Sequence, residues 1–297
     1  MAQQLSILIP VFNEEENLPQ CLESLGGLGD EVFVVDSFST DRTVELAKAA
    51  GARVVQHEYV NSAAQKNWAI PQCRHEWVFI IDADERMTPE LREEIRALLA
   101  RSEGPDWDGY FCVRRNYFLG GEIRHSGWQR NDVQRLFKRD LGRYAEREVH
   151  ADVEVGTGRS GRLKGRLDHV TLPPTIAGLN RYFQRFNRYT TQAAERYHRE
   201  GRKPRIWNFI FHPAWEFFRV YFVQFGILDG IPGLTIAAVS GFTRFVRYVK
   251  LYALILSKTP RHQSYNEGAS TARAIDGVAD AQAAGREADS KPEPARK

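Results

Sequence analysis

The sequence predicts an α/β protein built on a mixed, mainly parallel sheet, followed by an amphipathic helical region. Through the first hundred residues, short apolar runs rich in Val, Ile and Phe alternate with helical patterns, which favours a parallel sheet with right-handed crossovers. With 297 residues and 42% hydrophobic content, the chain can furnish a substantial core and is not typical of disordered proteins. From residue 173, aromatic and basic residues recur at helical spacing, and this change marks the second region.

Four strand-helix steps are expected before residue 105. The expected strands are 5–11, 31–36, 52–56 and 77–81, and the expected helices are 13–25, 43–50, 63–70 and 89–100. Asn13 is expected to cap the first of these helices, and Thr88 precedes a Pro-Glu start of the last one. Further along the chain, shorter strands are expected at 110–114, 133–138 and 162–169, and they should complete the same domain as a mixed sheet.

The net charge of +3 conceals an uneven distribution. Residues 1–100 carry 8 Lys and Arg against 17 Asp and Glu, whereas residues 101–260 carry 27 against 15. The second part should therefore meet an anionic partner such as phosphate, nucleic acid or acidic lipid. Cys21, Cys73 and Cys112 are scattered and indicate neither a disulfide framework nor a zinc site. Together with the absence of a signal-peptide pattern at the start, they favour a reducing, cytoplasmic setting.

Carboxylates follow the buried run 77–81 at its carboxyl end. Asp82 and Asp84 stand one residue apart there, and two such carboxylates can present oxygens to one hard cation that also takes substrate phosphates. Two of the other strand ends carry polar residues as well: Asn13 and Glu14 follow the strand 5–11, and Asp36 ends the strand 31–36. Ends of parallel strands converge on one crevice, so the residues predict a metal and nucleotide-diphosphate site. The alternative is a solvated turn before the next helix.

Five stretches of the sequence resemble those of a known family. They are Ile9-Pro10-Val11-Phe12-Asn13-Glu14-Glu15, Val35-Asp36-Ser37-Phe38-Ser39-Thr40-Asp41, Gln65-Lys66-Asn67, Ile81-Asp82-Ala83-Asp84-Glu85 and Arg135-Leu136-Phe137. On these, the chain resembles family-two glycosyltransferases with a GT-A, Rossmann-like domain, and specifically the bacterial lipopolysaccharide inner-core β-1,4-glucosyltransferases. The likeness covers about residues 4–260. Ser37 stands where many family members have a second Asp, and Ser is usual there in the lipopolysaccharide-core subgroup.

The resemblance implies roles for the three carboxylates. Asp36 would contact uracil, Asp82 the ribose or the metal, and Asp84 the divalent metal, Mg²⁺ or Mn²⁺, that bridges the diphosphate. The other expected donor-binding residues are Pro10, Phe12, Asn13, Glu14, Lys66 and Arg135. Together they imply a metal-dependent hexosyltransferase that uses a nucleotide-sugar donor.

Inverting transfer to a hydroxyl also needs a base that takes the acceptor proton. Asp132 resembles the position where family members carry a Glu-Asp base motif, although Asn131 replaces the Glu. Glu148 is the alternative base. His150 resembles the late histidine that completes the metal shell in some GT-A enzymes, and a purely structural histidine is the competing interpretation.

The region 173–260 is expected to associate with a membrane, because Trp and Tyr beside Lys and Arg on amphipathic helices suit an interfacial segment. The span 227–243 contains an Asp, a Pro and several glycines, which argues against a clean transmembrane helix and leaves a shallow or re-entrant insertion open. An ordinary helical subdomain or a dimer interface is the alternative. The predicted domains are therefore 1–172 and 173–260, with a disordered tail at 261–297.

The expected reaction is transfer of a hexose, glucose from UDP-glucose, onto a lipid-linked lipopolysaccharide inner-core sugar at the cytoplasmic face of the inner membrane, on an anionic surface. Transfer to a polyprenyl phosphate is the alternative enzyme activity, and a non-catalytic membrane-associated binding protein is the alternative outside catalysis. Gly156 to Gly161 matches a dinucleotide-binding pattern, but it opens no helix and is expected to be a hairpin or a loop. The basic residues form no recognised nucleic-acid module, so no nucleic-acid partner is expected.

Overall fold

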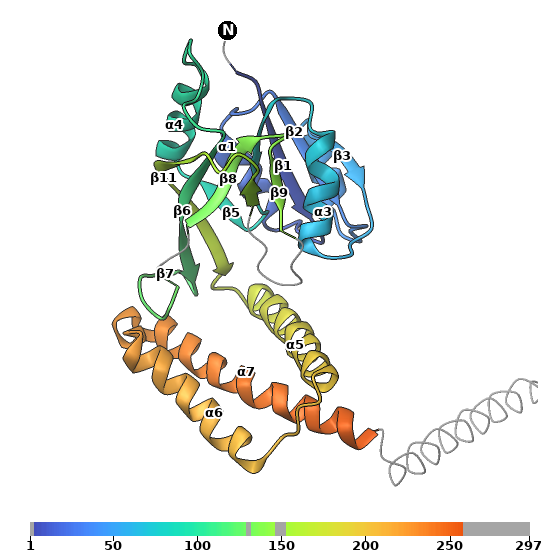
Figure 1. The fold of residues 1–297 in the computed structure, drawn as a ribbon, viewed down its shortest axis with the longest axis vertical. Coiled ribbons are helices and arrows are strands. Elements are labelled where there is room, and N and C mark those ends of the chain that lie inside the picture. The colour runs from blue at the N-terminus through green and yellow to red at the C-terminus, as the bar shows by residue number, and fades with distance from the viewer. Residues whose placement is uncertain (1–2, 129–131, 146–152, 258–297) are drawn as a thin grey trace, which may run out of the picture. The chain divides into compact units, whose positions relative to one another are not determined.

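The structure is a computed structural model that describes residues 3–128, 132–145 and 153–257 (Figure 1). These residues form two compact units. One contains the described residues up to Tyr182 together with Arg219–Ala237, and the other contains Phe183–Phe218 together with the described residues from Ala238. The domain boundaries expected after residues 172 and 260 stay predictions, and the expected tail 261–297 lies outside the described residues.

The first unit is organised around a nine-stranded sheet, counted within the described ranges, in the order β3-β2-β1-β4-β8-β6-β11-β5 with β7 paired to β6. The strands are β1 (Leu5–Val11), β2 (Glu31–Asp36), β3 (Arg53–Gln56), β4 (Trp77–Ile80), β5 (Glu85–Met87), β6 (Gly109–Phe118), β7 (Gly121–Ile123), β8 (Asp132–Lys138) and β11 (Ser160–Leu172). Strands β1 to β4 pair in parallel, and β8 joins them antiparallel to β4. The predicted α/β class with a mixed, mainly parallel sheet is confirmed.

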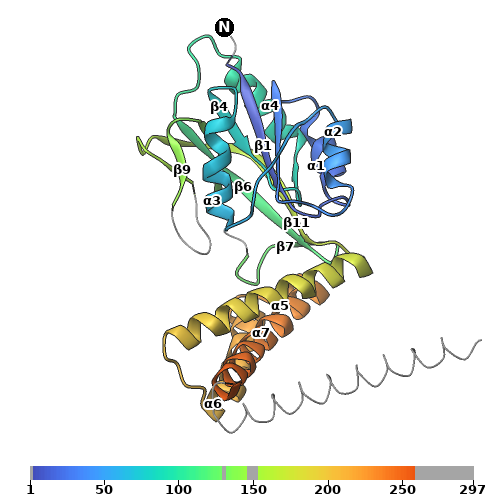
Figure 2. The ribbon, with the colours of Figure 1, turned by 90° about the vertical axis from the view of Figure 1, so that its right-hand side faces the viewer.

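Helices cover both faces of this sheet (Figure 2). They are α1 (Leu18–Leu25), α2 (Thr43–Ala49), α3 (Ser62–Ala69) and α4 (Pro89–Leu99). Apolar residues of α1, α2 and α4 pack on one face of the sheet, and those of α3 pack on the other. These two layers bury the strands on both sides, which explains their nearly continuous apolar sequences.

The first helix begins later than predicted. Asn13 does not cap it, because Asn13 lies in the loop after β1 with a φ of +54° and Asn17 occupies the N-cap position before Leu18. The β1–α1 loop hydrogen-bonds to the loop after β2, and these contacts hold Asn13 outside the helix. In contrast, the helix start at Thr88 is confirmed, since its side chain accepts from the Leu91 amide.

Several short strands escaped prediction. These are β5, β7 and the separate hairpin of β9 (Gly142–Tyr144) and β10 (Val153–Val155), each only three residues long. Such strands have too few residues to display an alternating pattern. The glycine-rich stretch 156–161 forms the turn before β11 and opens a strand, as expected for a loop and not for a dinucleotide site.

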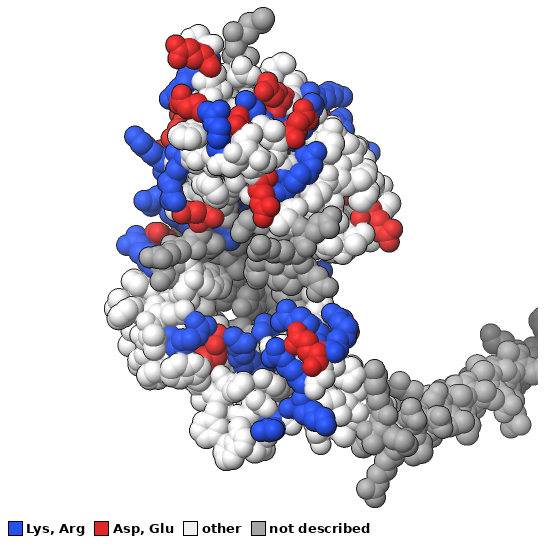
Figure 3. Space-filling view, viewed as in Figure 1, with Lys and Arg blue, Asp and Glu red and all other residues white. Residues whose placement is uncertain are grey.

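The second unit is helical. Its elements come from α5 (Ile176–Arg199), α6 (Ile206–Phe218) and α7 (Gly230–Ser257), the last two joined through a π-helical turn (Arg219–Val223) and a 3₁₀ turn (Gly226–Asp229). The Lys250 ammonium of α7 donates to the Asn187 carbonyl and to Thr190 Oγ1 of α5, both at 2.8 Å. In this unit uncharged surface covers α6, whereas Lys and Arg gather over α5 (Figure 3).

Helix α7 is continuous from Gly230 to Ser257, although the span 227–243 contains a Pro and several glycines. Pro232 and Gly233 lie in its first turn, where a missing backbone N–H costs no hydrogen bond, and the apolar sequence runs on to Ser257. Gly241 lies inside the helix where it crosses α6, and a Cβ there would lie 2.8 Å from the Pro213 carbonyl oxygen. By length and composition, 226–257 is the one helical stretch in the described chain that could cross a membrane.

Candidate functional site

The carboxyl ends of β1 and β2 lie side by side, because the two strands pair in parallel with Val11 opposite Asp36. The loops that follow are joined by hydrogen bonds. The Thr40 amide donates to Asn13 Oδ1 at 2.8 Å, and the Asn13 amide donates to Ser39 Oγ at 2.8 Å. These two loops therefore form one continuous edge beside the carboxyl end of β4, which pairs with β1.

Asp36 is fully buried at the end of β2. Its carboxylate accepts from the Ser39 amide at 3.0 Å, from the Ser39 hydroxyl and from Gln56 Nε2 at 2.9 Å. A carboxylate has about four acceptor sites, so these three donors leave about one for a ligand. The nucleobase contact expected for Asp36 stays a prediction.

The other expected donor-binding residues of this edge lie at the same strand ends. Pro10 belongs to β1, Phe12 just beyond it is 51% exposed, and the Glu14 amide donates to Thr43 Oγ1 at 2.8 Å. Phe38, just beyond β2, is 56% exposed. A nucleobase has a flat face that can stack on exposed aromatic rings of this kind.

Asp82 lies at the centre of a charged cluster below this edge. Its Oδ1 lies 2.9 Å from Lys66 Nζ and its Oδ2 lies 2.9 Å from Arg135 Nη2. The same Arg135 nitrogen lies 2.6 Å from Glu85 Oε1, and Arg114 approaches that oxygen at 3.4 Å. Glu85 is fully buried, whereas 32% of the Asp82 side chain remains exposed. The cluster therefore fixes Asp82 while leaving part of it open to a ligand.

These contacts set the protonation of the cluster. Burial alone would raise the pKa of Asp82, but Lys66 and Arg135 outweigh burial and hold that pKa well below its usual range. Burial alone would lower the pKa of Lys66, but the Asp82 carboxylate outweighs burial and raises it. Burial would likewise lower the pKa of Arg135, but the Glu85 and Asp82 carboxylates outweigh burial and raise it. Asp82, Lys66 and Arg135 are therefore charged at neutral pH, and the diphosphate contacts expected for Lys66 and Arg135 stay predictions.

The stretch Gln65-Lys66-Asn67 acts as a junction between three parts of the fold. Gln65 Nε2 donates to Ser37 Oγ at 2.6 Å, and Lys66 pairs with Asp82. Asn67 exchanges two hydrogen bonds with the backbone of Tyr144 in β9, at 2.8 and 2.9 Å. Helix α3 therefore holds three parts of the fold in fixed positions: the loop after β2, Asp82 after β4, and strand β9.

His169, near the end of β11, is a site residue that the sequence analysis missed. Its Nε2 lies 3.5 Å from Asp84 Oδ2, because β11 pairs antiparallel with β5 and places His169 opposite Glu85. Asn116 Nδ2 donates to the Trp128 carbonyl at 3.1 Å, so Asn116 Oδ1 faces His169 Nδ1 at 2.8 Å. An amide oxygen only accepts, so Nδ1 carries the hydrogen and Nε2 presents its lone pair to Asp84.

Asp84 and His169 fit a divalent cation. Two acceptor atoms at 3.5 Å need either a second proton on the imidazole or a cation between them. Ligands about 2.1 Å from a cation and at right angles to each other lie about 3.0 Å apart, close to this separation. Among the residues that the structure describes, no three His, Cys, Asp or Glu side chains form a complete cage. Mg²⁺ needs no such cage, since it commonly takes one or two protein ligands plus waters and substrate phosphates.

We expect Asn116→Ala to weaken divalent-metal binding about 10- to 100-fold, because partners that orient a metal-binding histidine typically contribute this much. Calorimetric titration of Mn²⁺ in the presence of UDP measures the affinity. Unchanged affinity would show that the Asn116 contact does not orient a metal ligand.

Of the remaining expected site residues, Asp132 lies in the described part of the chain. Asp132 begins β8, and both its oxygens accept from the Arg162 guanidinium, at 2.9 and 2.5 Å, in an exposed pair. Glu148 and His150 lie outside the described residues, as does Asn131. The roles expected for these residues stay predictions.

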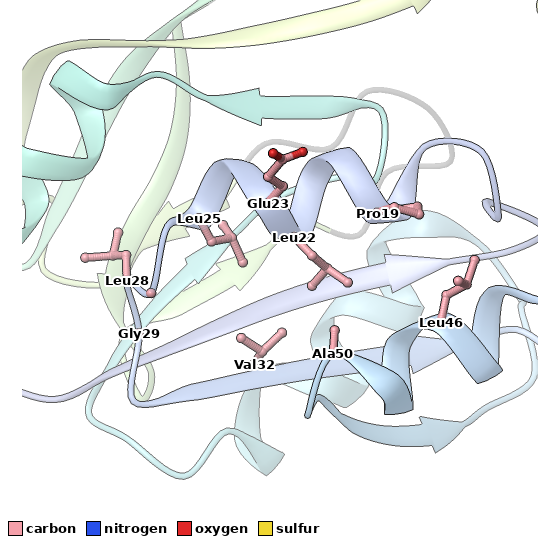
Figure 4. A pocket seen from close by; sticks show the side chains of 10 residues that line it. Pro19, Leu22, Glu23, Leu25, Leu28, Gly29, Val32, Leu46 and Ala50 are labelled. Carbon is pink, nitrogen blue, oxygen red and sulfur yellow. The ribbon is translucent and has the colours of Figure 1, made fainter.

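An apolar pocket lies apart from this crevice. It occupies about 450 Å³ between α1 and α2 (Figure 4). Its lining is Pro19, Leu22, Glu23, Leu25, Gly27, Leu28, Gly29, Val32, Leu46 and Ala50. With a single charged residue in this lining, it lacks the groups that a nucleotide diphosphate requires.

Comparisons with known proteins show the family of this chain. The model of glycosyl transferase family 2 matches residues 6–165, more than half of the chain. The lipopolysaccharide core biosynthesis glycosyltransferase LpsC of Rhizobium meliloti (strain 1021) is 32% identical over 258 residues, which cover 84% of this chain and 92% of LpsC. An uncharacterized glycosyltransferase of Rickettsia bellii (strain RML369-C) is 25% identical over 279 residues, which cover 89% of this chain and 91% of that protein.

Among solved structures, that of S. aureus TarS 1–349 in complex with UDP-GlcNAc is similar with a TM-score of 0.44 and 17% identity, over 56% of this chain and 58% of TarS. The family match includes the three carboxylates at the strand ends and the Lys66–Asp82–Arg135 cluster. The chain therefore belongs to glycosyltransferase family 2 and has the GT-A fold of that family.

Proposed function

We propose that this protein transfers a hexose, glucose from UDP-glucose, onto an inner-core sugar of lipopolysaccharide with inversion at the anomeric carbon. The observation that carries the proposal is the pairing of Asp84 with His169 next to the Asp82 cluster, at the carboxyl ends of parallel strands. This is where an open α/β sheet binds nucleotides. The similarity to LpsC, which is named for lipopolysaccharide core biosynthesis, supports this class of acceptor.

Each part of the crevice has a task in this reaction. Asp36 would accept from the uracil ring, and Asp82, fixed by its two cations, would accept from the ribose. Asp84 and His169 would hold Mg²⁺ or Mn²⁺. A bound divalent cation would neutralise the negative charge that the departing diphosphate acquires. The Asn116 contact keeps His169 in the tautomer that this requires.

A polyprenyl phosphate is the second candidate acceptor, and one observation favours it. A phosphate oxygen is already ionised and needs no base, and Asp132, the base expected from the sequence, has both oxygens engaged by Arg162. Turnover of the same enzyme with a lipopolysaccharide acceptor and with a polyprenyl phosphate separates the two acceptors. A loss of about 10²–10⁴-fold in Asp132→Asn would indicate a hydroxyl acceptor with Asp132 as its base.

The proposed function is tested by calorimetric titration of the purified protein with UDP-glucose, UDP-galactose, UDP-GlcNAc and GDP-mannose, with and without Mn²⁺. We expect UDP-glucose to bind in a metal-dependent manner. Binding of another sugar alone would change the proposed donor. If no nucleotide sugar binds, the protein is better explained as a membrane-associated binding protein without catalysis.

We also propose that α6 lies in the membrane surface. Trp207, Phe211 and Trp215 recur at four-residue spacing on one face of α6 and are 57–60% exposed. The described part of the second unit carries ten Lys and Arg against three Glu. Exposed aromatics combined with net positive charge are typical of helices that lie on anionic membranes. Residence at the cytoplasmic face of the inner membrane follows from the proposed donor and acceptor.

Replacing Trp207, Phe211 and Trp215 together by Ser should lower binding to anionic liposomes by more than about 10²-fold, because each buried aromatic contributes about 2 kcal/mol. Flotation with phosphatidylglycerol vesicles measures this effect. Thermal stability and UDP-glucose binding should not change, since the three side chains are exposed. A triple variant that still floats like the wild type would refute membrane contact through α6.

A further inference from the structure

We propose that His125, oriented by Asp229, takes the proton from the acceptor hydroxyl. This inference rests on the proposed function and adds a catalytic residue that neither the motifs nor the comparisons assign. His125 lies in the loop after β7, and Asp229 ends the 3₁₀ turn before α7. Both belong to the first compact unit although about a hundred residues separate them in the chain.

Asp229 is built to hold His125 in one orientation. Its side chain is only 2% exposed, and its carboxylate accepts from the backbone amides of Arg124 and His125, both at 3.1 Å. It also accepts from Ser126 Oγ at 2.9 Å and lies 3.0 Å from His125 Nδ1. An ionised carboxylate only accepts, so Nδ1 carries the hydrogen and Nε2 is left as a proton acceptor. This is the arrangement by which an acidic residue orients a histidine base.

The loop that carries His125 is held in an unusual conformation. Ser126 has a φ of +61°, in the left-handed region that side chains other than Gly and Asn seldom occupy. Its amide donates to the Gln224 carbonyl at 2.9 Å, and a Cβ at Gly127 would lie 2.7 Å from Gln224 Oε1. Strained backbone that is fixed by surrounding contacts is concentrated at functional sites.

The same loop is joined to the metal-binding pair. Trp128 donates its amide to the His125 carbonyl at 3.1 Å, and Asn116, which orients His169, donates to the Trp128 carbonyl. In the sheet, His169 lies opposite Asn116, and Asn116 lies opposite Ile123. Two strand spacings, about 10 Å, therefore separate the backbone at His169 from the strand that leads to His125. This span suits a diphosphate-bound hexose with an acceptor beside it.

The Nε2 of His125 is available for this task. The imidazole is 34% exposed, and its described partners all lie on the Nδ1 side and the backbone. Asp132, in comparison, has both oxygens engaged by Arg162. Asp132 and His125 are the candidate bases within the described residues. His125 is the one of the two that combines an oriented side chain with an open acceptor atom.

In the transfer step, the acceptor O–H bond breaks and its proton moves to His125 Nε2. The oxygen lone pair forms the bond to the anomeric carbon of the sugar. The bond between that carbon and the diphosphate oxygen breaks, and its electron pair leaves with the nucleoside diphosphate. The imidazolium is stabilised by the Asp229 carboxylate and then loses its proton to solvent.

The test compares His125→Asn, Asp132→Asn and the control His75→Asn, using UDP-glucose and a deacylated, core-truncated lipopolysaccharide. Asn at position 125 can still donate to Asp229 but has no proton acceptor in the place of Nε2. We expect kcat to fall about 10²–10⁴-fold in His125→Asn, with unchanged UDP-glucose affinity and Tm. His75 lies before the amino end of β4, away from the crevice, and its variant should keep wild-type kcat.

Asp229 is a positioning residue, and its test is non-additivity. The double variant His125→Asn with Asp229→Asn should be no slower than His125→Asn alone, because both changes remove the same proton acceptor. Additive losses would indicate that Asp229 acts only on the fold. Added imidazole should restore part of the activity of His125→Ala, which a merely structural role would not permit.

Two results would overturn the inference. One is a kcat of His125→Asn within about threefold of the wild-type value, regardless of the kcat of Asp132→Asn. The other is loss of UDP-glucose binding in both His125→Asn and His125→Ala, which would place His125 in donor binding or folding. Absence of UDP-glucose binding by the wild-type protein is a separate outcome, since it would refute the proposed function itself.

Discussion

Asp84→Asn should lower the turnover of UDP-glucose by about 10³-fold or more, equivalent to about 4 kcal/mol of transition-state stabilisation. The amide has nearly the same shape as the carboxylate but lacks the charge that holds a divalent cation. His169→Ala should have an effect of the same kind, because His169 Nε2 is the partner of Asp84 at 3.5 Å. Initial rates at saturating acceptor, measured across a range of Mn²⁺ concentrations, give both effects.

The dependence on metal concentration separates metal binding from other roles of Asp84. If Asp84 and His169 hold the cation, higher Mn²⁺ should restore part of the activity of His169→Ala, since one ligand remains. Asp140→Asn is the matched control, because Asp140 is 76% exposed and pairs with Arg139 on the surface. Wild-type metal dependence in Asp84→Asn would contradict this assignment.

The donor side of the site could be predicted from sequence because its residues follow strands with clear patterns. Asp36 and Asp82 each come directly after an apolar run of at least four residues, so the strand and its carboxyl end are both visible in the sequence. Parallel pairing then brings the ends together without further information. In the structure Asp36 and Asp82 lie at the carboxyl ends of β2 and β4, the two strands that flank β1.

His169 could not be found in this way because its position depends on a strand too short to recognise. The expected strand 162–169 ended on it, so a polar residue at a strand end was the available signal. However, His169 reaches Asp84 only because β5, with three residues, pairs antiparallel with β11. A pairing between segments about 80 residues apart leaves no periodic trace in the sequence.

Lys66 and Arg135 are expected ligand contacts, but their partners within the protein are not visible in the sequence. Both residues are at most 6% exposed and are bound to carboxylates of the chain itself. Charged residues are rarely buried unless paired, but the partner is decided by the sheet order, which places β8 next to β4. The same order explains why the cluster forms beside the carboxyl end of β4.

Stability should depend strongly on this cluster. Arg135→Met should lower the free energy of unfolding by about 3–5 kcal/mol, because the fully buried Glu85 carboxylate would keep only the longer contact to Arg114 among its described ion pairs. Urea denaturation followed by circular dichroism measures the change. Arg101→Met, which breaks an exposed pair with Asp106, should cost no more than about 1 kcal/mol.

The pH dependence of unfolding should report the same contacts. The pKa of Asp82 is held below its unfolded value of about 3.9, so the folded state binds fewer protons than the unfolded state in this range. The stabilisation by Asp82 is therefore complete above that unfolded value and is lost as the pH falls toward the depressed pKa of the folded state. Arg135→Met should reduce this loss, since it removes one of the two cations that depress the pKa.

A second substitution distinguishes loss of a charge partner from loss of packing. In the Arg135→Met background, Glu85→Gln removes the uncompensated charge. The neutral side chain can still accept from the Asp82 backbone amide, which donates to Glu85 Oε2 at 3.0 Å. We therefore expect the double variant to recover a large part of the lost stability. If Glu85→Gln gives no recovery, the cost of Arg135→Met comes from the cavity and not from the buried carboxylate. Stability would then depend on the shape of the cluster more than on its charge.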